Sequence, residues 1–195
     1  ESVCMSEIVH GQPNMYFLFM AMAVKMLRTN GEFVFITPRS WTSGTYFKSF
    51  RSYFMDSMDI QRVHLFESRN SVFKGKEGHS DDILQETMIT YGKKSKSQSR
   101  NIIIAISQNA QDLGKVKEIQ VESGNCLPEG KEHYFVLPSD EEDLKVLNYM
   151  KKMPNTVEEA GFRFKTGQVV EFRNKEYIAW EKKESTIPLL SLIHI

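Results

Sequence analysis

Apolar helical segments alternate with apolar extended segments along the first hundred residues. From Pro13 to the stop at Gly31 nearly every position is apolar, which predicts a buried helix packed against a sheet. Residues 33–36 (Phe-Val-Phe-Ile) follow as a continuous apolar run, the pattern of a parallel strand covered on both faces. Residues 45–58 carry aromatic side chains at helical spacing, opposite polar ones that include Arg51, and predict an amphipathic helix.

Two further strands continue this alternation. Residues 60–66 and 83–91 each have the composition of a strand, and the loop between them contains Gly75 and Gly78. The order helix, strand, helix, strand is that of an α/β protein. A right-handed crossover would place the strands that flank a helix in one sheet.

The second half of the chain predicts short elements after a basic segment. Residues 92–100 hold four cations and no acid, which is typical of a linker or an exposed hairpin. We expect short strands at residues 101–107, 116–121 and 133–137. Ser139 opens a capping-box pattern, which predicts a helix that continues to residue 152.

The loop after residues 33–36 is a candidate binding site, because it places Arg39, Trp41 and several hydroxyl side chains at the end of a strand. Ligands of open α/β sheets bind beyond the carboxyl ends of the parallel strands. Periodicity alone favours a simpler interpretation. In that interpretation Ser43 or Thr45 caps the next helix, and Trp41 folds back onto the core.

Composition is that of an ordinary globular protein and does not narrow the function. The chain is 41% hydrophobic, and Lys plus Arg equals Asp plus Glu at 25 each, so net charge neither favours nor excludes nucleic acid. Cys4 and Cys126 form no CxxC pair, which indicates neither a disulfide framework nor a zinc site and favours a reducing compartment. No segment has the pattern of a signal peptide or a membrane span, so we expect a cytoplasmic protein without membrane contact.

Both ends suggest that the chain is part of a longer polypeptide. It begins with Glu1 rather than methionine, and it ends on the apolar segment 187–195. We therefore expect a fragment of a longer protein.

Three segments, in this order, resemble the N6-adenine DNA methyltransferases of type II restriction–modification systems. They are HGQPNMYFLFMAMAVKMLRTNGEFVFITPRSWTSGTYFKSFRSYF, VHLFESRNSVF and DDILQETMI. The resemblance is closest to the Taq-like class and to bifunctional enzymes with a fused nuclease, and it covers residues 8–92. It implies an α/β fold that contains the last strands of a Rossmann-like S-adenosylmethionine-dependent methyltransferase sheet. The fifth strand would be residues 33–37 and the sixth 60–66, with the seventh, 83–91, antiparallel between them.

The resemblance implies a reaction and a domain organisation. A methyl group would pass from S-adenosyl-L-methionine to the N6 of adenine in double-stranded DNA. Residues 1–92 would end the catalytic domain, residues 93–160 would form a linker and a small α+β connecting segment, and residues 161–195 would begin a target recognition domain. The family's glycine-rich cofactor motif and Asn-Pro-Pro-Tyr motif are absent here. We therefore expect both in a missing N-terminal part of the same polypeptide, and we expect this fragment to be inactive alone.

The resemblance also assigns candidate site residues. A methylase must flip its target base out of the duplex, and the family stacks that base on an aromatic side chain at the place that Phe73 occupies. Arg39 is positioned to meet a DNA phosphate or the flipped nucleotide. From Gly161 the sequence GFRFKTGQVVEFRNKEYI resembles the start of the recognition region. Its candidate DNA contacts are Lys165, Thr166, Gly167 and Arg173.

Several alternatives stay open. Phe73 could instead cover the sheet edge, and the cations near Thr166 could belong to an exposed hairpin. Asp81, Asp82 and Glu86 lack the downstream ExK of a nuclease site, so we expect no metal. The same fold could serve a protein or RNA methyltransferase, although the segment from Gly161 disfavours this. The absent motifs also leave a non-catalytic α/β interaction module as an interpretation.

Overall fold

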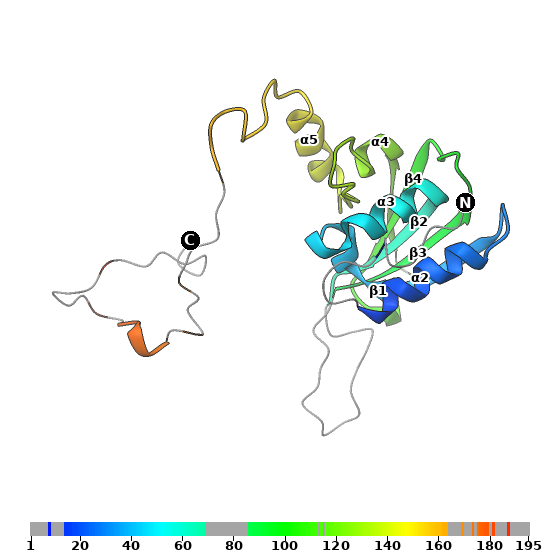
Figure 1. Cartoon of the computed structure of the whole chain (residues 1–195), viewed down its shortest axis with the longest axis horizontal. Coiled ribbons are helices and arrows are strands. Elements are labelled where there is room, and N and C mark those ends of the chain that lie inside the picture. Colours follow the sequence, from blue (N-terminus) through cyan, green and yellow to red (C-terminus); the bar gives the residue numbers. More distant parts are fainter. Residues whose placement is uncertain are drawn as a thin grey trace. The chain divides into compact units, whose positions relative to one another are not determined.

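The chain forms two units in a computed structural model, Glu1–Lys152 and Met153–Ile195. The structure describes residues 8, 14–68, 86–112, 114, 116–163, 169, 173, 175–179, 181 and 187. The first unit contains the sheet and the helices that cover it (Figure 1). In the second unit the described residues include a short 3₁₀ helix, η5 (Lys175–Tyr177).

A five-stranded sheet forms the centre of the first unit. In chain order the strands are β1 (Glu32–Pro38), β2 (Met58–Phe66), β3 (Thr87–Lys94), β4 (Asn101–Ser107) and β5 (Lys117–Glu122). Across the sheet the order is β1-β3-β2-β4-β5. Because β3 runs antiparallel to both β1 and β2, those two strands are parallel to each other. Strand β4 is parallel to β2, and β5 is antiparallel to β4. The predicted α/β fold, with an antiparallel strand inserted between two parallel ones, is confirmed.

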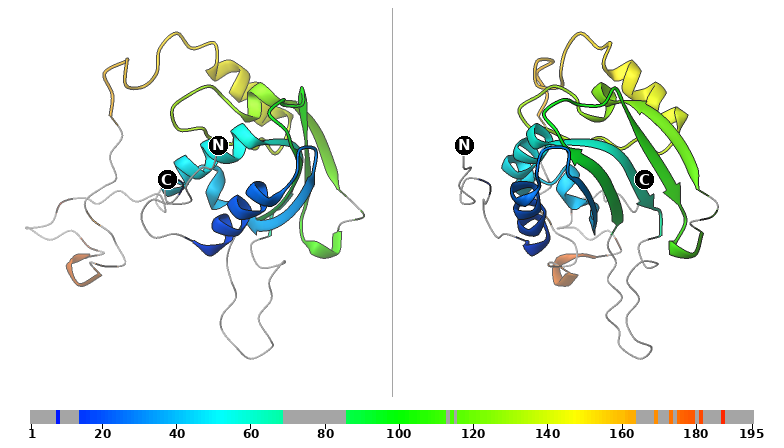
Figure 2. Two further views of the ribbon diagram at one scale, coloured as in Figure 1. Left: turned by 45° about the vertical axis from the view of Figure 1, so that its right-hand side comes forward. Right: turned by 90° about the vertical axis from the view of Figure 1, so that its right-hand side faces the viewer.

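Helices α2 (Met15–Met26) and α3 (Lys48–Ser57) lie on one face of this sheet (Figure 2). Aromatic rings fill the space between them and the strands. Phe54 of α3 meets Phe33 of β1 edge to face at 5.4 Å, and Phe17 of α2 lies 5.4 Å from Phe50. The edge-to-face geometry of the first pair is one that aromatic rings prefer. The core therefore sits between α2, α3 and the sheet.

The prediction that residues 33–36 are covered on both faces is wrong. Phe33 is 6% exposed and faces the helices, whereas Val34 is 65% and Ile36 47% exposed. A strand sends alternate side chains to opposite faces. No helix in the described part of the chain covers the face that carries Val34 and Ile36.

The prediction that the first helix packs against the sheet is confirmed, but the helix is buried on one side only. In α2 the residues Phe17, Met20, Ala21 and Val24 are buried, because they pack toward the sheet and α3. The opposite side is open, and its large apolar residues are exposed by 48% to 80%: Met15, Phe19, Met22 and Met26. An apolar composition all round a helix favours burial, but burial also needs a neighbour on each side.

We expect the isolated chain to self-associate through the β1 edge. Among the described residues β1 pairs with β3 alone, and an unpaired apolar edge is a template for another strand. The double variant Val34→Lys and Ile36→Lys should shift the mass measured by analytical ultracentrifugation toward the 22.6 kDa monomer. Val146→Lys on α5 (Glu141–Met150), a control at a residue 57% exposed, should change nothing. A wild-type chain that stays monomeric at every concentration would contradict this expectation.

Residues 92–94 of the basic segment end β3, and residues 95–100 cross over the amino end of β2 instead of forming a hairpin or a linker between domains. Strand β3 ends beside Met58, and β4 begins on the other side of β2. The Gln98 amide donates to the main-chain oxygens of Met55 and Met58 at 2.8 and 2.9 Å. The Ser99 main-chain N–H and hydroxyl donate to the Asp59 carboxylate at 2.6 and 2.7 Å. This crossover joins β4 and β5 to the same sheet as β1–β3.

Asp59→Asn should lower the free energy of unfolding by about 1–3 kcal/mol at neutral pH. Burial alone would raise the pKa of Asp59, but hydrogen bonds from Ser99 and Gln61 and the charge of Lys93 outweigh it, and the pKa lies below its ordinary value. The stabilisation is therefore present above the unfolded-state pKa and is lost as pH falls through the folded-state pKa. Urea titrations should show the difference between wild type and variant shrinking below about pH 4. A difference that grows on acidification would contradict the assignment.

The remainder of the first unit is a short helix, an extended segment and α5. Helix α4 (Ser123–Cys126) follows β5 directly. The predicted strand at residues 133–137 is wrong, because this segment makes isolated main-chain bonds, Phe135 N–H to Thr42 O and Val136 N–H to Cys126 O, instead of a ladder.

The amino end of α5 is capped one residue later than predicted. Asp140 accepts a hydrogen bond from Asp143 N–H at 2.9 Å, and the Asp143 carboxylate accepts one from Ser139 N–H at 2.7 Å. The first bond satisfies a donor that the helix leaves unpaired, and the second ties the residue before the cap to the first turn. Within the described residues no helix is long and apolar enough to cross a membrane.

Candidate functional site

A cleft of about 800 Å³ opens at the carboxyl end of β1. One wall is residues 38–43, which include the 3₁₀ helix η1 (Arg39–Thr42). The other wall is residues 134–137, and Glu86, immediately before β3, completes the lining. The candidate binding site predicted from the sequence, the loop after residues 33–36, lies at this end of the sheet.

Arg39 joins the two walls, and its charge is only loosely paired. Its side chain is 35% exposed, and its guanidinium donates to Leu137 O at 3.3 Å. Its Nη1 lies 3.9 Å from a Glu86 carboxylate oxygen that is itself partly exposed. An ion pair of this kind contributes about 0–1 kcal/mol. The guanidinium can therefore exchange the carboxylate for an anionic ligand at little cost.

Trp41 does not line the cleft. Its ring is fully buried against Phe50 and Phe54, and its indole N–H donates to the Thr37 hydroxyl at 3.2 Å. The interpretation that Trp41 folds back onto the core is confirmed. The expected side-chain cap from Ser43 or Thr45 is wrong, because α3 begins after Phe47 without one.

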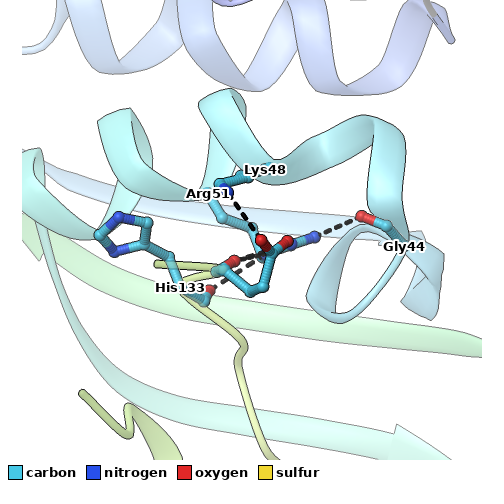
Figure 3. A network of polar contacts seen from close by, with 5 residues as sticks. Gly44, Lys48, Arg51 and His133 are labelled. Carbon is cyan, nitrogen blue, oxygen red and sulfur yellow. Dashed lines mark hydrogen bonds and ion pairs between the residues drawn. The ribbon is translucent and has the colours of Figure 1, made fainter. Parts of the chain in front are cut away.

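Arg51, which the pattern placed among the polar positions of an amphipathic helix, is fully buried. Its guanidinium donates to main-chain oxygens in or next to both walls, and Figure 3 shows its bonds toward Gly44 and His133. On one side Nη1 reaches Trp41 O at 3.0 Å and Gly44 O at 2.6 Å. On the other, Nε and Nη2 reach Glu132 O at 3.2 and 2.8 Å, and Nε also reaches His133 O at 3.1 Å. Arg51 therefore holds the two walls at a fixed separation.

The electrostatics of Arg51 reflect this burial. Loss of solvent lowers the pKa of its guanidinium, and the charges of Tyr134 and Glu132 partly oppose the shift. An arginine remains protonated in spite of such a shift, because its unperturbed pKa is so high. At the rim Lys48 pairs with the Glu132 carboxylate at 2.6 Å.

The main chain beside Arg51 is held in an uncommon conformation. His133 has φ 50°, in the left-handed region, which costs a residue with a Cβ roughly 1–2 kcal/mol. The hydrogen bonds that Arg51 makes to Glu132 O and His133 O offset this cost. They thereby fix the start of the second wall.

The other candidate residues are only partly within the described structure. Phe73, Lys165, Thr166 and Gly167 lie outside the described residues. Arg173 is described and is exposed in the second unit.

A second cleft, of about 790 Å³, lies among α2, α3 and the start of the basic crossover. Its described lining includes one carboxylate, Asp56, and four lysines: Lys25, Lys48, Lys94 and Lys96. S-adenosylmethionine carries a net positive charge, from a sulfonium and an ammonium group against one carboxylate, and four lysines around a single carboxylate would repel it. The second cleft therefore does not fit this cofactor. The first cleft presents Arg39 beside Glu86 and no surplus carboxylate for that charge, so no step through the cofactor follows from these residues.

No group of three or more potential metal ligands occurs within the described ranges. Of the three acids weighed from the sequence, Glu86 faces the Arg39 guanidinium, and Asp81 and Asp82 lie outside the described residues. The described residues of the first cleft therefore offer hydrogen-bond donors, the cationic Arg39 and the aromatic surface of Tyr134.

Sequence comparison finds relatives along nearly the whole chain. Residues 5–73 match the family described as Eco57I restriction-modification methylase. The type II methyltransferase M.PstI of Providencia stuartii is 30% identical over 183 residues, which are 93% of this chain and 35% of the relative. The type II methyltransferase M.BsuBI of Bacillus subtilis is 32% identical over 180 residues, 90% of this chain and 34% of the relative. The chain thus spans about a third of the length of these relatives.

Among solved structures, the M protein of the type I restriction enzyme EcoKI aligns with 74% of this chain and 45% of its own. The sequence identity is 7% and the TM-score 0.45. A likeness this weak adds nothing to the sequence relationship.

Proposed function

We propose, from the premise that this chain belongs to the type II restriction–modification methyltransferases, that it is the C-terminal part of an adenine-specific DNA methyltransferase domain with the start of a recognition domain. The full-length enzyme would transfer a methyl group from S-adenosyl-L-methionine to the N6 of adenine in double-stranded DNA. The observation that carries the proposal is the 30% identity to M.PstI over 93% of the chain. We expect the cofactor and the Asn-Pro-Pro-Tyr motif to lie in an N-terminal part of the same polypeptide, and the enzyme to work in the cytoplasm.

The cleft at β1 supports a role in holding the substrate nucleotide. It lies beyond the carboxyl end of a parallel strand, where α/β proteins bind ligands. Arg39 would meet a phosphate, which suits the fork of a guanidinium better than its loose pairing with Glu86. Phe73 would stack on the flipped adenine. The recognition segment would meet the DNA backbone through Lys165, Thr166, Gly167 and Arg173.

The domain organisation that we propose keeps residues 1–92 as the end of the catalytic domain. Residues 93–160 would connect it to the recognition domain that begins at residue 161. Strands β4 and β5 of the connecting segment extend the same sheet.

The product of the reaction tests the proposal. The full-length enzyme would be incubated with duplex DNA and methyl-labelled S-adenosylmethionine, and the digested nucleosides analysed by mass spectrometry. We expect the methylated nucleoside to be N6-methyl-2′-deoxyadenosine. A methylated cytosine would rule out the adenine assignment. Methylation of RNA or protein alone would favour the alternative that the enzyme is an RNA or protein methyltransferase of the same fold. Calorimetry that finds no cofactor binding would favour a non-catalytic module.

Arg39→Gln in the full-length enzyme should weaken duplex DNA binding roughly tenfold. One phosphate contact fewer should also reduce the slope of log K against log salt by about 1. Fluorescence anisotropy at several salt concentrations measures both. The matched control is Arg62→Gln on β2, whose partner is Glu118 and which lies outside the cleft lining. Equal effects from both variants would mean that Arg39 contributes only general charge.

A further inference from the structure

Tyr134 is an accessible aromatic side chain in the wall that faces Arg39. It lines the first cleft, and 43% of its surface is exposed. The guanidinium carbon of Arg51 lies 5.3 Å from the centre of its ring. Because Arg51 is fully buried, this cation–π contact holds the ring from the protein side and leaves the rest of its surface open.

The main chain on both sides of Tyr134 is anchored. Before it, Arg51 binds the His133 oxygen at 3.1 Å. After it, Phe135 N–H donates to Thr42 O at 2.9 Å, and the Phe135 ring packs 5.8 Å from that of Trp41. Phe135 is itself 2% exposed. The ring of Tyr134 is therefore presented on a rigid support, which reduces the conformational entropy lost on binding a ligand.

The two walls together present the groups that a nucleotide needs. A base offers a flat π surface to an aromatic ring, and its phosphate offers an anion to a guanidinium. Tyr134 and the loosely paired Arg39 supply these two groups in one cleft. Ser40 and Ser43 line the same cleft.

We propose that Tyr134 stacks on a nucleobase of single-stranded or locally opened DNA in this cleft, and that Arg51 is a positioning residue that holds the Tyr134 ring for this contact. The proposal rests on the proposed function and extends it to a second aromatic contact, separate from Phe73. It concerns a nucleobase next to the phosphate that Arg39 meets. The protein side of this contact is formed by Tyr134 and Arg51, which both belong to the described part of the chain.

The experiment measures binding of two single strands to the full-length protein. One probe is a short fluorescein-labelled oligodeoxyadenylate, and the other is a strand of equal length and charge without bases. Tyr134→Ala should weaken binding of the oligodeoxyadenylate roughly 5- to 150-fold and leave the abasic strand unchanged. Tyr134→Phe should stay within about twofold of wild type, because the ring is kept. Tyr149→Ala, at a tyrosine of α5 that is 67% exposed, is the matched control and should bind as wild type.

A double-mutant cycle separates positioning by Arg51 from general stability. Arg51→Lys should weaken binding of the oligodeoxyadenylate in the wild-type background but not in the Tyr134→Ala background. Equal losses in both backgrounds would overturn the positioning role. Loss of both probes in Tyr134→Ala, or of neither, would overturn the stacking role.

The outcomes also distinguish this inference from the proposed function. A wild-type enzyme that methylates DNA, with Tyr134→Ala binding the oligodeoxyadenylate normally, would defeat the inference alone. A wild-type enzyme that methylates no DNA and binds neither strand would defeat both. Circular dichroism and thermal melting of each variant confirm that the compared proteins are folded.

Discussion

Arg51→Met should lower the free energy of unfolding of the chain by about 3–5 kcal/mol. Methionine keeps an unbranched apolar stem but donates no hydrogen bond. Four main-chain oxygens, those of Trp41, Gly44, Glu132 and His133, would then lose the donor that joins them. Buried acceptors left without donors cost more than the bonds contribute when formed. Urea denaturation followed by circular dichroism measures the loss.

Two controls separate this effect from loss of a charge. Arg51→Lys keeps the charge and three donors but not the planar fork, so we expect an intermediate loss of about 1–3 kcal/mol. Arg62→Met removes an arginine that is 39% exposed and pairs with Glu118, and it should cost no more than about 1 kcal/mol. An Arg51→Met chain as stable as wild type would show that the carbonyls find other donors.

If Phe73 stacks on the flipped adenine as we propose, Phe73→Ala in the full-length enzyme should slow methylation roughly 5- to 150-fold, because such stacking contributes about 1–3 kcal/mol. S-adenosylmethionine affinity should stay near that of wild type. Phe73→Trp should retain much of the rate, since a larger ring still stacks. The measurement is single-turnover methylation of duplex DNA alongside cofactor titration.

A modified substrate provides the control for Phe73. Removing the base opposite the target adenine lowers the cost of flipping, so this duplex should partly rescue the alanine variant. If Phe73 only packs against the sheet edge, alanine would lower the melting temperature and leave turnover per folded molecule unchanged. That pattern would rule out stacking.

Strand positions could be predicted because a buried strand appears in the sequence as a short run of apolar residues. The apolar run at residues 33–36 lies within β1, and residues 101–107 coincide with β4. Which face is covered could not be predicted, because Val34 and Phe33 are equally apolar and differ only in what lies opposite. The order of the first three strands came from the family resemblance and not from composition.

The site was predictable only as far as one of its walls. Arg39 follows a strand directly, so its place at the carboxyl end of β1 was visible in the sequence. The role of Arg51 was not, because its acceptors at Glu132 and His133 come from a segment distant in sequence. A polar residue in a helical pattern predicts solvent unless such acceptors are known. Tyr134 was missed for a related reason, since residues 133–137 have the composition of a strand but pair with no strand among the residues that the structure describes.

The position of β3 has a consequence for the order in which the sheet can assemble during synthesis. Glu32 pairs with Lys93 and Pro38 with Thr87, so β1 can pair with β3 only after both β2 and β3 have been synthesised. A nascent chain that stops before residue 87 therefore carries β1 without its β3 partner. Until β3 leaves the ribosome, the edge of β1 that β3 later covers is open to other chains, and such exposure is what chaperones relieve. The rate at which the ribosome passes from β2 to β3 thus sets how long the growing protein is exposed to aggregation.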